Sequence, residues 1–479
     1  MHQMGTPAVA RSAVWPQVQV GVGPASGIRK YAGLLTSAAL TVYILQSFAR
    51  LGDVFPVIQP LRLGLLTQAA LVLVLLTKQA RAMLRSAISH PTSASVAVLA
   101  ALAVVTVPTG AWPTGSLNHL TGVYYNSLLL FAAGILAFGS SRTRTAVVCT
   151  VVVLAAYTAA QPLLSGKIGR FGIGFTYDQN VTGAYLVMLV PWAAAWAAVE
   201  RDARWKLLPL LALPLLVYGI ARTGSRGGVL GLFAMIPFLY AVAPPRRRGM
   251  LVAIAAVVTI MFVSYGKKPL RNFRKLTNKT DYNYVHLDGR VEVWKRGMSY
   301  VRERPITGYG INGFRWRELD WKLDTMGGGK DTAAHNMYLE VAVDLGLIGL
   351  AAFLTACIGA LVRLAGLRYR AMVRFRATGD PADAEFAAFA GAAAASLLSV
   401  MVTGFFLSIA HQAPMYFVWA AAVGMTVAEQ RRLAQPRPGA PAGTAPSGRS
   451  GAQTNGGGWR SRHSAQRWQL KHGRSHPTR

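Results

Sequence analysis

Long apolar runs alternate with short polar or basic segments along most of this 479-residue chain. Twelve of these runs approach the length of about 20 apolar residues that a helix needs to cross the hydrocarbon core of a bilayer. The pattern therefore predicts an all-α polytopic membrane protein with about 12 transmembrane helices. The predicted spans are 32–49, 62–77, 93–109, 121–139, 146–163, 181–199, 206–221, 228–243, 250–265, 337–362, 385–403 and 412–428.

Basic residues gather in alternate connections between these runs, and the positive-inside rule places such connections in the cytoplasm. The residues concerned are Lys78, Arg81, Arg85, Arg142, Arg144, Arg201, Arg204, Lys206, Arg246, Arg247, Arg248, Arg363, Arg368, Arg370, Arg374 and Arg376. The predicted organisation is a cytoplasmic segment 1–31, nine helices over 32–265, one large extracytoplasmic loop 266–336 with short helices, three helices over 337–428 and a basic cytoplasmic tail 429–479.

Composition agrees with a membrane protein, because 53% of the residues are hydrophobic and only 14% are charged. The 50 Lys and Arg residues against 18 Asp and Glu would suit a nucleic-acid partner. Their clustering between apolar runs argues against one, since no basic stripe is interleaved with stacking aromatic residues. Cys149 and Cys357 both lie inside apolar runs, so neither a disulfide framework nor a zinc site is expected.

The two ends of the chain carry weaker signals. Residues 1–28 lack the apolar core of a cleavable signal peptide, so the first span is expected to start insertion. The tail has ten Lys or Arg from Gln430 onward and no acid, which predicts disorder. It either attracts anionic membrane lipids or is a solvated extension that reinforces topology.

The end of the large loop carries the first candidate for chemistry. Val291, Trp294, Met298 and Val301 have helical spacing, which predicts a short amphipathic helix. His335 then precedes an apolar run, so an imidazole is held at the mouth of a membrane helix, where a histidine can accept a proton near neutral pH. Alternatively, His335 and Asn336 only cap that helix. Both interpretations stay open.

Arg222 and Arg226 lie in the segment ARTGSRGGVLG between two predicted spans. If this segment is helical, the two arginines are four residues apart on one face. Arginine at membrane depth usually pairs with an anion, and the adjacent glycines allow a ligand to approach closely. The structural alternative is that the side chains reach out to lipid headgroups or pair with an internal acid.

Arg290 immediately precedes the predicted loop helix, where its planar guanidinium group could hold a diphosphate through two hydrogen bonds. For Arg296, Arg302 and Arg304 we expect a solvated helix face.

Asp178 and Asn180 stand at the entry to the sixth span and could cap it or contact substrate. Glu340 and Asp344 follow Asn336 by four and eight residues, so the three share one helical face. Asp344 then lies about 12 Å along the helix, a depth that requires a cationic partner. Arg222 and Arg226 are the expected candidates.

Several familiar motifs do not apply. Gly308, Gly310 and Gly313 spell G-x-G-x-x-G, but no strand of a βαβ unit precedes them, so a dinucleotide site is rejected. No Walker loop, H-E-x-x-H helix or G-x-S-x-G elbow occurs, and no acidic cluster suggests Mg²⁺. The sequence predicts no metal site and no cofactor.

The ordered segments RTGSRGG, DGRVEVWKRGMSYVRERPITGYGINGF and AHNMYLEVAVDLGLIGL resemble the O-antigen ligase and polymerase family, and YDQN before the sixth span is similar to a weaker upstream motif. The resemblance covers roughly residues 165–360. It implies a glycosyltransferase-C-like fold and a metal-independent glycosyltransferase in the bacterial inner membrane, active on its extracytoplasmic side. The donor would be a glycan on undecaprenyl diphosphate, and the acceptor a glycan or a lipid A-core sugar.

Carried over by motif, Arg226 and Arg290 would hold the diphosphate, Arg222 would assist, and His335 would activate the acceptor hydroxyl. Asn336, Asp344, Asp178 and Asn180 would support the site. Within this interpretation the sequence leaves a ligase, a polymerase of lipid-linked repeat units and a protein glycosyltransferase open. A flippase for lipid-linked sugars is the alternative from another class, although such transporters commonly show inverted repeats and broken helices at the midplane.

Overall fold

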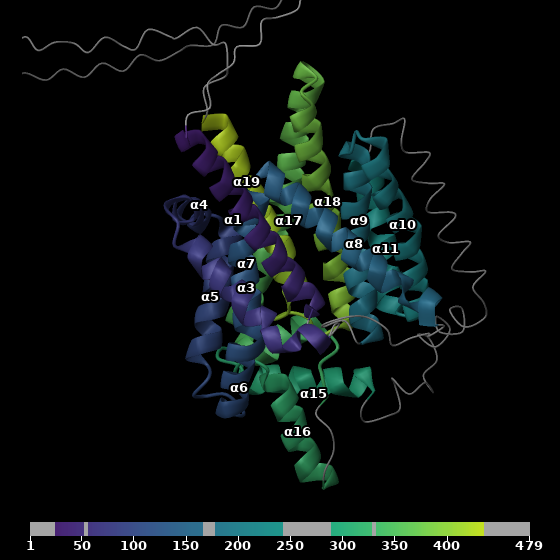
Figure 1. Ribbon diagram of the computed structural model, residues 1–479. Helices are drawn as coiled ribbons and strands as arrows, with labels where there is room; N and C mark the ends of the chain where they lie inside the picture. The colour runs from purple at the N-terminus through teal and green to yellow at the C-terminus, as the bar shows by residue number, and fades with distance from the viewer. Residues whose placement is uncertain (1–23, 52–55, 166–177, 243–288, 328–331, 435–479) are drawn as a thin grey trace, which may run out of the picture. The chain divides into compact units, whose positions relative to one another are not determined.

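The chain folds into a bundle of helices in the computed structural model, which describes residues 24–51, 56–165, 178–242, 289–327 and 332–434 (Figure 1). These segments contain no β-strand. The first half comprises α1 (Pro24–Ala49), η1 (Pro56–Leu61), α3 (Leu63–Leu75), α4 (Lys78–Ile88), α5 (Pro91–Val105), α6 (Pro113–His119), η2 (Leu120–Tyr124), α7 (Tyr125–Phe138), α8 (Ser141–Ser165), α9 (Gln179–Val199), α10 (Ala203–Thr223) and α11 (Arg226–Val242). The second half comprises α15 (Arg290–Glu303), α16 (Gly313–Met326), α17 (Met337–Thr378), α18 (Pro381–Thr403), η3 (Gly404–Phe406) and α19 (Ala413–Ala434).

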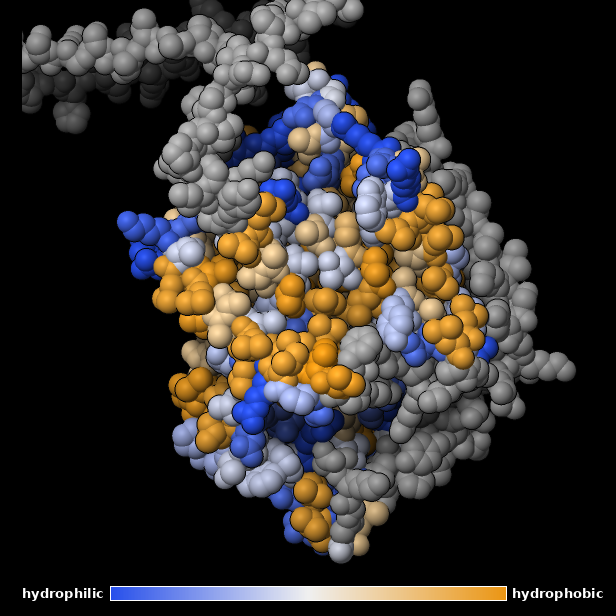
Figure 2. All heavy atoms as spheres, viewed as in Figure 1, coloured by the Kyte–Doolittle hydropathy of each residue, from blue (hydrophilic) through white to orange (hydrophobic). Residues whose placement is uncertain are grey.

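The helices confirm a polytopic membrane protein. Within the described residues, seven helical segments are long and apolar enough to cross a bilayer, or eight if the bent pair α4 and α5 forms one span. These segments are Val57–Leu75, Pro113–Phe138, Ser141–Leu164, Gln179–Val199, Ala203–Thr223, Met337–Thr378 and Pro381–Phe406. Two shorter apolar helices are Gly33–Ala49 and Arg226–Leu239. Figure 2 shows hydrophobic side chains gathered across the middle of the visible face, with hydrophilic residues above and below.

Each predicted span coincides with a helix except 250–265, which lies outside the described residues, so the number twelve stays a prediction. Two boundaries differ from expectation. The connection predicted over residues 78–92 contains α4, which meets α5 at an angle of 92°. At the other end, α19 continues past residue 428 to Ala434, because Arg432 forms ion pairs with Asp380 and Asp383 at the start of α18.

Helices α18 and α19 form the centre of the bundle. Every residue of α19 from Pro414 to Val427 is buried, and α18 buries a run of alanines from Ala392 to Ala395. Small residues bring the helices close, as a Cβ atom on Gly134 of α7 would lie 2.6 Å from the Cβ atom of Ala420. Close backbone approach of this kind is how membrane helices gain packing energy when lipid tails are as apolar as their own side chains.

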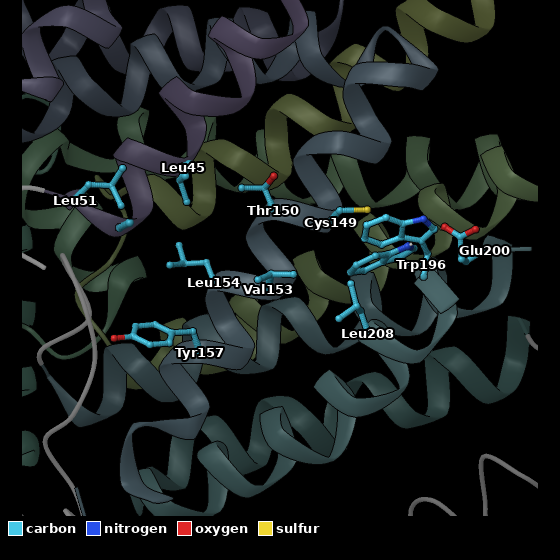
Figure 3. Close-up of a pocket in the computed structure, with 12 residues that line it drawn as sticks. Leu45, Leu51, Cys149, Thr150, Val153, Leu154, Tyr157, Trp196, Glu200 and Leu208 are labelled. Carbon is cyan, nitrogen blue, oxygen red and sulfur yellow. Dashed lines mark hydrogen bonds between the residues drawn. The ribbon is translucent and has the colours of Figure 1, made fainter. Parts of the chain in front are cut away.

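An apolar cavity of about 640 Å³ lies between α1, α8, α9 and α10. Figure 3 shows Leu45, Val153, Leu154 and Leu208 along its wall, with Trp196 and Glu200 at one end. A cavity with this lining suits hydrocarbon chains better than a charged substrate. It contains none of the residues predicted to carry chemistry.

Helix α17 is broken at Gly346, whose φ of 71° and ψ of −175° are not helical. The backbone of the α15–α16 loop occupies the break. The Leu347 N–H donates to the Pro305 carbonyl at 2.7 Å, and the Tyr309 N–H donates to the Val343 carbonyl at 2.8 Å. Gly308 and Gly310 of the G-x-G-x-x-G sequence have positive φ in this same loop. These glycines therefore serve the packing of the loop against α17, not a nucleotide.

Gly346→Ala is expected to lower the free energy of unfolding by about 1–3 kcal/mol or more. This is the cost of forcing a residue with a Cβ atom into a backbone conformation that essentially only glycine adopts. The added Cβ would also collide with the Ile306 carbonyl. Thermal unfolding of the purified protein, followed by intrinsic fluorescence, measures the effect. Gly359→Ala in the same helix is the matched control, because nothing lies within 4 Å of a Cβ placed there. Equal unfolding temperatures for the two variants would contradict this role of the break.

Candidate functional site

The segment RTGSRGG forms a sharp turn between two helices. α10 ends at Thr223, Gly224 has the left-handed conformation with φ of 67°, and α11 begins at Arg226. Ser225 caps α11, since its Oγ accepts the Gly228 N–H at 3.1 Å. The expectation that Arg222 and Arg226 share one helical face is therefore wrong, because the glycine ends the first helix between them.

The two arginines consequently have different surroundings. Arg222 lies in the last turn of α10, with its guanidinium carbon 5.7 Å from the centre of the Tyr218 ring. A cation is favourable at a helix C-terminus. Arg226 instead occupies the first position of α11, where the helix dipole disfavours a cation. Its side chain makes no hydrogen bond or ion pair with any residue that the structure describes.

Arg290 repeats this arrangement at the start of α15. The preceding Gly289 provides no side-chain cap, so the first N–H groups of the helix are not satisfied by a capping side chain. Burial lowers the pKa of Arg290, the nearby positive charge of Arg226 lowers it further, and Asp178 opposes both. Like Arg226, Arg290 has no hydrogen bond or ion pair within the described part of the chain.

His335 lies directly before α17 in a left-handed backbone conformation with φ of 48°. Its N–H donates to Ser408 Oγ at 2.9 Å, which ties it to the loop between α18 and α19. The cap of α17 is Asn336, whose Oδ1 accepts the N–H groups of Tyr338 and Leu339 at 3.0 and 3.1 Å. The capping interpretation thus holds for Asn336, and the imidazole of His335 is left for another role.

Burial lowers the pKa of His335 to about 4, and the positive charges of Arg290 and Arg315 act in the same direction. Asp178 partly offsets them. The imidazole is therefore neutral at physiological pH, which is the form that can accept a proton.

Asp178 caps α9, because its Oδ1 accepts the N–H groups of Asn180 and Val181 at 2.8 and 3.2 Å. The side chain also acts electrostatically on Arg290 and His335, so capping and proximity to the site occur together. Asn180 lies in the first turn of α9 and contributes its backbone N–H to the cap.

Arg290 thus lies within electrostatic range of Arg226, Asp178 and His335, and His335 within range of Asp178, although the four residues come from separate segments. Each stands at the start of a helix, and the four helices are α9, α11, α15 and α17. Helix N-termini carry partial positive charge and unpaired N–H groups, which attract anions. The arrangement is an electropositive site beside a neutral histidine.

Close packing holds these helix starts in place. Gly183 of α9 lies against Ser225, where an added Cβ would be 2.8 Å from the serine Cβ. Trp294 of α15 donates its indole N–H to the Ala334 carbonyl at 2.9 Å, and its ring meets Phe405 edge-on at 5.6 Å. In α15 the predicted amphipathic helix is confirmed, but Met298 is 48% exposed while Gly297 and Tyr300 are buried.

Two further residues contact or act on this site without a sequence motif that marks them. Arg315 of α16 acts on His335 electrostatically, and Ser408 positions its backbone. Arg315 follows the loop glycines and has only its charge to mark it in the sequence. Ser408 lies in a short connection that carries no recognisable motif.

Asp344 has a different partner from the one expected. Its carboxylate accepts the N–H groups of Asn312 and Phe314 at 2.9 and 2.8 Å, at the start of α16, and lies 3.1 Å from His411 Nε2. Burial alone would lower the pKa of His411, but its hydrogen bond to Asp344 raises it above the ordinary value. The prediction of an arginine partner from the α10–α11 turn is wrong, because the start of α16 and His411 satisfy the buried carboxylate instead. Asp344 supports the loop and not the site directly.

Asp344→Asn is expected to destabilise the protein by about 3–5 kcal/mol, the range for breaking a buried charged pair. The new amide group replaces one oxygen that accepts a backbone N–H and removes the negative charge beside His411. Thermal unfolding of the purified variant measures the loss. Asp324→Asn on the exposed side of α16 serves as the control, and an equal effect at both positions would refute the capping role of Asp344.

The other loop arginines fall into two groups. Arg302 is exposed, as expected, and Arg304 is exposed but donates to the Thr109 carbonyl at 2.9 Å. Arg296 is not on a solvated face, because it donates two hydrogen bonds to buried Glu318, from Nε at 2.9 Å and from Nη2 at 2.7 Å. Glu318 lies on the buried face of α16, and the sequence pattern does not reveal that an acidic residue is buried there. Within the described residues, His, Cys, Asp and Glu side chains form no group of three suited to a metal ion.

Comparison with known proteins bears on the same residues. Residues 210–354 match the model of the O-antigen ligase family. The resemblance drawn from the motifs is thereby confirmed. The O-antigen ligase match extends from α10 into α17 and includes Arg222, Arg226, Arg290 and His335.

The chain is also 25% identical over 172 residues to an uncharacterized protein of Haemophilus influenzae. That match covers 33% of this chain and 43% of the other protein, so the chain spans less than half the length of this relative. The O-antigen ligase match is the comparison that informs function.

Proposed function

We propose that this protein is a membrane glycosyltransferase that moves a glycan from undecaprenyl diphosphate to a hydroxyl group of an acceptor. The observation that carries the proposal is that Arg290, at the start of α15, lies within electrostatic range both of Arg226, at the start of α11, and of the neutral imidazole of His335. The O-antigen ligase match over the same residues supports it.

The arginines fit the donor side of this reaction. As the glycosidic bond breaks, negative charge grows on the leaving diphosphate, and fixed positive groups in a water-poor site stabilise it. Arg226 and Arg290 each occupy a position where the helix dipole disfavours a cation, and neither has an ion pair among the described residues. A diphosphate would neutralise both, and Arg222 in the adjacent turn would assist. The mechanism needs no divalent ion because the guanidinium and N–H groups supply the positive charge.

His335 fits the acceptor side. A neutral imidazole can take the proton of the attacking hydroxyl, and such general-base catalysis typically contributes about 10² to 10⁴-fold in rate. Binding of the anionic diphosphate would raise the pKa of His335, because it neutralises the arginines that now depress it. The base would therefore become stronger once the donor is in place.

Location follows from charge and hydropathy. The basic connections predict that α15 and α16 lie outside the cytoplasm, so the site would be on the periplasmic side of the bacterial inner membrane. The isoprenoid chain of the donor would then remain among membrane lipids while its diphosphate reaches the helix N-termini. Acceptors of two kinds fit this geometry: a lipid A-core sugar, as in a ligase, or a growing chain on the same carrier, as in a polymerase.

Deletion of the gene tests the proposal in the cell. A ligase should leave full-length glycan on the lipid carrier and none on its anchor, whereas a polymerase should leave single repeat units. Complementation with the wild-type gene should restore the surface glycan, and complementation with an Arg226→Ala variant should not. Unchanged surface glycan in the deletion strain would overturn the proposal. Loss of all lipid-linked glycan from the outer leaflet would instead favour a flippase.

A further inference from the structure

A second cavity, of about 550 Å³, lies between α1, α3, the η2–α7 segment and the start of α19. It differs from the cavity in Figure 3 because its wall is rich in amides. Gln46, Gln68, Asn126 and Gln412 line it, together with Arg50 at the end of α1, and no acidic residue lies among its described lining. The volume falls in the range of pockets that hold small-molecule ligands.

Burying an amide side chain inside a membrane helix costs free energy unless its hydrogen-bonding groups find partners. Gln46, Gln68 and Asn126 belong to apolar helices that can enter the membrane, and polar groups in such helices usually mark a binding site or a pathway. Each retains hydrogen-bonding capacity. Gln46 Oε1 accepts the Leu51 N–H at 3.0 Å, which leaves its NH₂ group unbonded within the described residues. Gln68 Nε2 donates to Asn126 Oδ1 at 2.8 Å, which leaves the Gln68 oxygen without a described donor.

The backbone around the cavity is also irregular. The wall formed by Gly122 and Val123 belongs to η2, a five-residue π-helix inserted before α7. Single π-helical turns are rare and occur frequently at functional sites. Arg50 has a left-handed backbone with φ of 45°, which is uncommon for a residue with a side chain, and it makes no described ion pair.

The cavity is linked to His335 through the loop between α18 and α19. Ser408 accepts the His335 N–H through its Oγ, and its carbonyl accepts Gln412 Nε2 at 3.2 Å. The next residue back from Gln412, His411, is held from the other side, because Ser127 Oγ donates to its carbonyl at 2.8 Å. A ligand in the cavity would thus rest against the same short loop that positions the proposed base.

We propose that this cavity binds neutral sugar rings of the acceptor. The inference rests on the proposed function and adds the place where the acceptor is held. Sugar hydroxyls both donate and accept hydrogen bonds, and amides offer both kinds of partner, whereas a phosphate would need several cations. One arginine among several amides selects a neutral or weakly anionic glycan. The diphosphate and the acceptor therefore use different groups: arginines at helix N-termini for the first, amides between membrane helices for the second.

Steady-state kinetics with separately varied donor and acceptor test the assignment. Gln68→Leu and Gln46→Leu are expected to raise the KM for the acceptor roughly tenfold, the effect of leaving one buried hydroxyl unpaired, and to leave the KM for the donor unchanged. Thr150→Leu in the apolar cavity of Figure 3 is the matched control and should alter neither value. A rise in the donor KM alone, or no change in either, overturns the acceptor assignment.

A binding measurement that does not require turnover separates this inference from the proposed function. In a background with Cys149 and Cys357 replaced by Ala, Val123→Cys, which lines the cavity and leaves its amides in place, is labelled with a maleimide in the presence and absence of oligosaccharides released by mild acid from the surface glycan of the same bacterium. Protection at this position, with none for Tyr157→Cys in the apolar cavity, supports a glycan site even if transfer fails. Equal labelling with and without oligosaccharide, in a protein that does transfer glycan, overturns the inference and leaves the proposed function standing.

Discussion

His335→Asn should reduce the rate of glycan transfer by roughly 10² to 10⁴-fold, the usual contribution of a general base. Asparagine is the informative replacement because it tolerates the left-handed backbone that His335 adopts, whereas alanine would add strain. The variant should reach the membrane and unfold at the same temperature as the wild type, since the cap of α17 belongs to Asn336. Single-turnover transfer with saturating donor and acceptor measures the effect.

The pH dependence gives an independent check on this base. Because the pKa of His335 is lowered to about 4, the base is neutral above that pH and becomes protonated below it. The value of kcat/KM reports the free enzyme, so we expect no inflection from His335 between pH 5 and 7. The inflection in kcat should appear at a higher pH, because the bound diphosphate favours the imidazolium. A variant with full activity, or a kcat/KM inflection near the ordinary pKa of histidine, would contradict the assignment.

Arg290→Lys is the second change with a large expected effect. Lysine keeps the charge but cannot form two parallel hydrogen bonds to a diphosphate. The loss of one hydrogen bond to a charged group, about 1.5–3 kcal/mol, corresponds to a decrease of roughly 10- to 150-fold in kcat/KM for the donor. Binding of undecaprenyl diphosphate to the detergent-solubilised variant, followed by microscale thermophoresis, should weaken by a similar factor.

Arg302→Lys provides the matched control, because this arginine lies on the exposed side of the same helix. It should bind the donor like the wild type. If Arg290→Lys also retains wild-type donor binding and transfer, Arg290 does not hold the diphosphate, and the remaining arginines would have to account for the reaction.

Much of the helical framework follows from the sequence because apolar runs of bilayer length have few other stable forms. The sequence also predicts where α9 and α17 begin, because Asp178 and Asn336 are residue types that favour the N-cap position and each directly precedes an apolar run. The motif order also predicts that the arginines and His335 lie on one side of the membrane, and in the structure Arg290 lies within electrostatic range of both Arg226 and His335.

Tertiary contacts that depend on a single backbone conformation were not predictable in this way. Gly224 breaks the helix between Arg222 and Arg226, and Gly346 breaks α17, although glycine occurs elsewhere in this chain within regular helix. The first break places the two arginines on different helices, and the second receives the α15–α16 loop, after which the start of α16 donates two backbone N–H groups to Asp344. The amide-lined cavity could not be predicted for another reason. Its residues come from helices far apart in the sequence, and a single Gln or Asn carries no motif that indicates a binding site.

The central claim is that this chain itself transfers glycan, with its arginines holding the diphosphate and His335 acting as base. The most direct measurement is release of undecaprenyl diphosphate by the purified protein in detergent, supplied with a lipid-linked glycan and an acceptor. We expect one diphosphate carrier released for each glycan joined to the acceptor, and neither product with His335→Asn. Transport needs a sealed membrane and catalysis does not, so a wild-type protein that is inactive in detergent but moves lipid-linked glycan across liposomes would contradict the account.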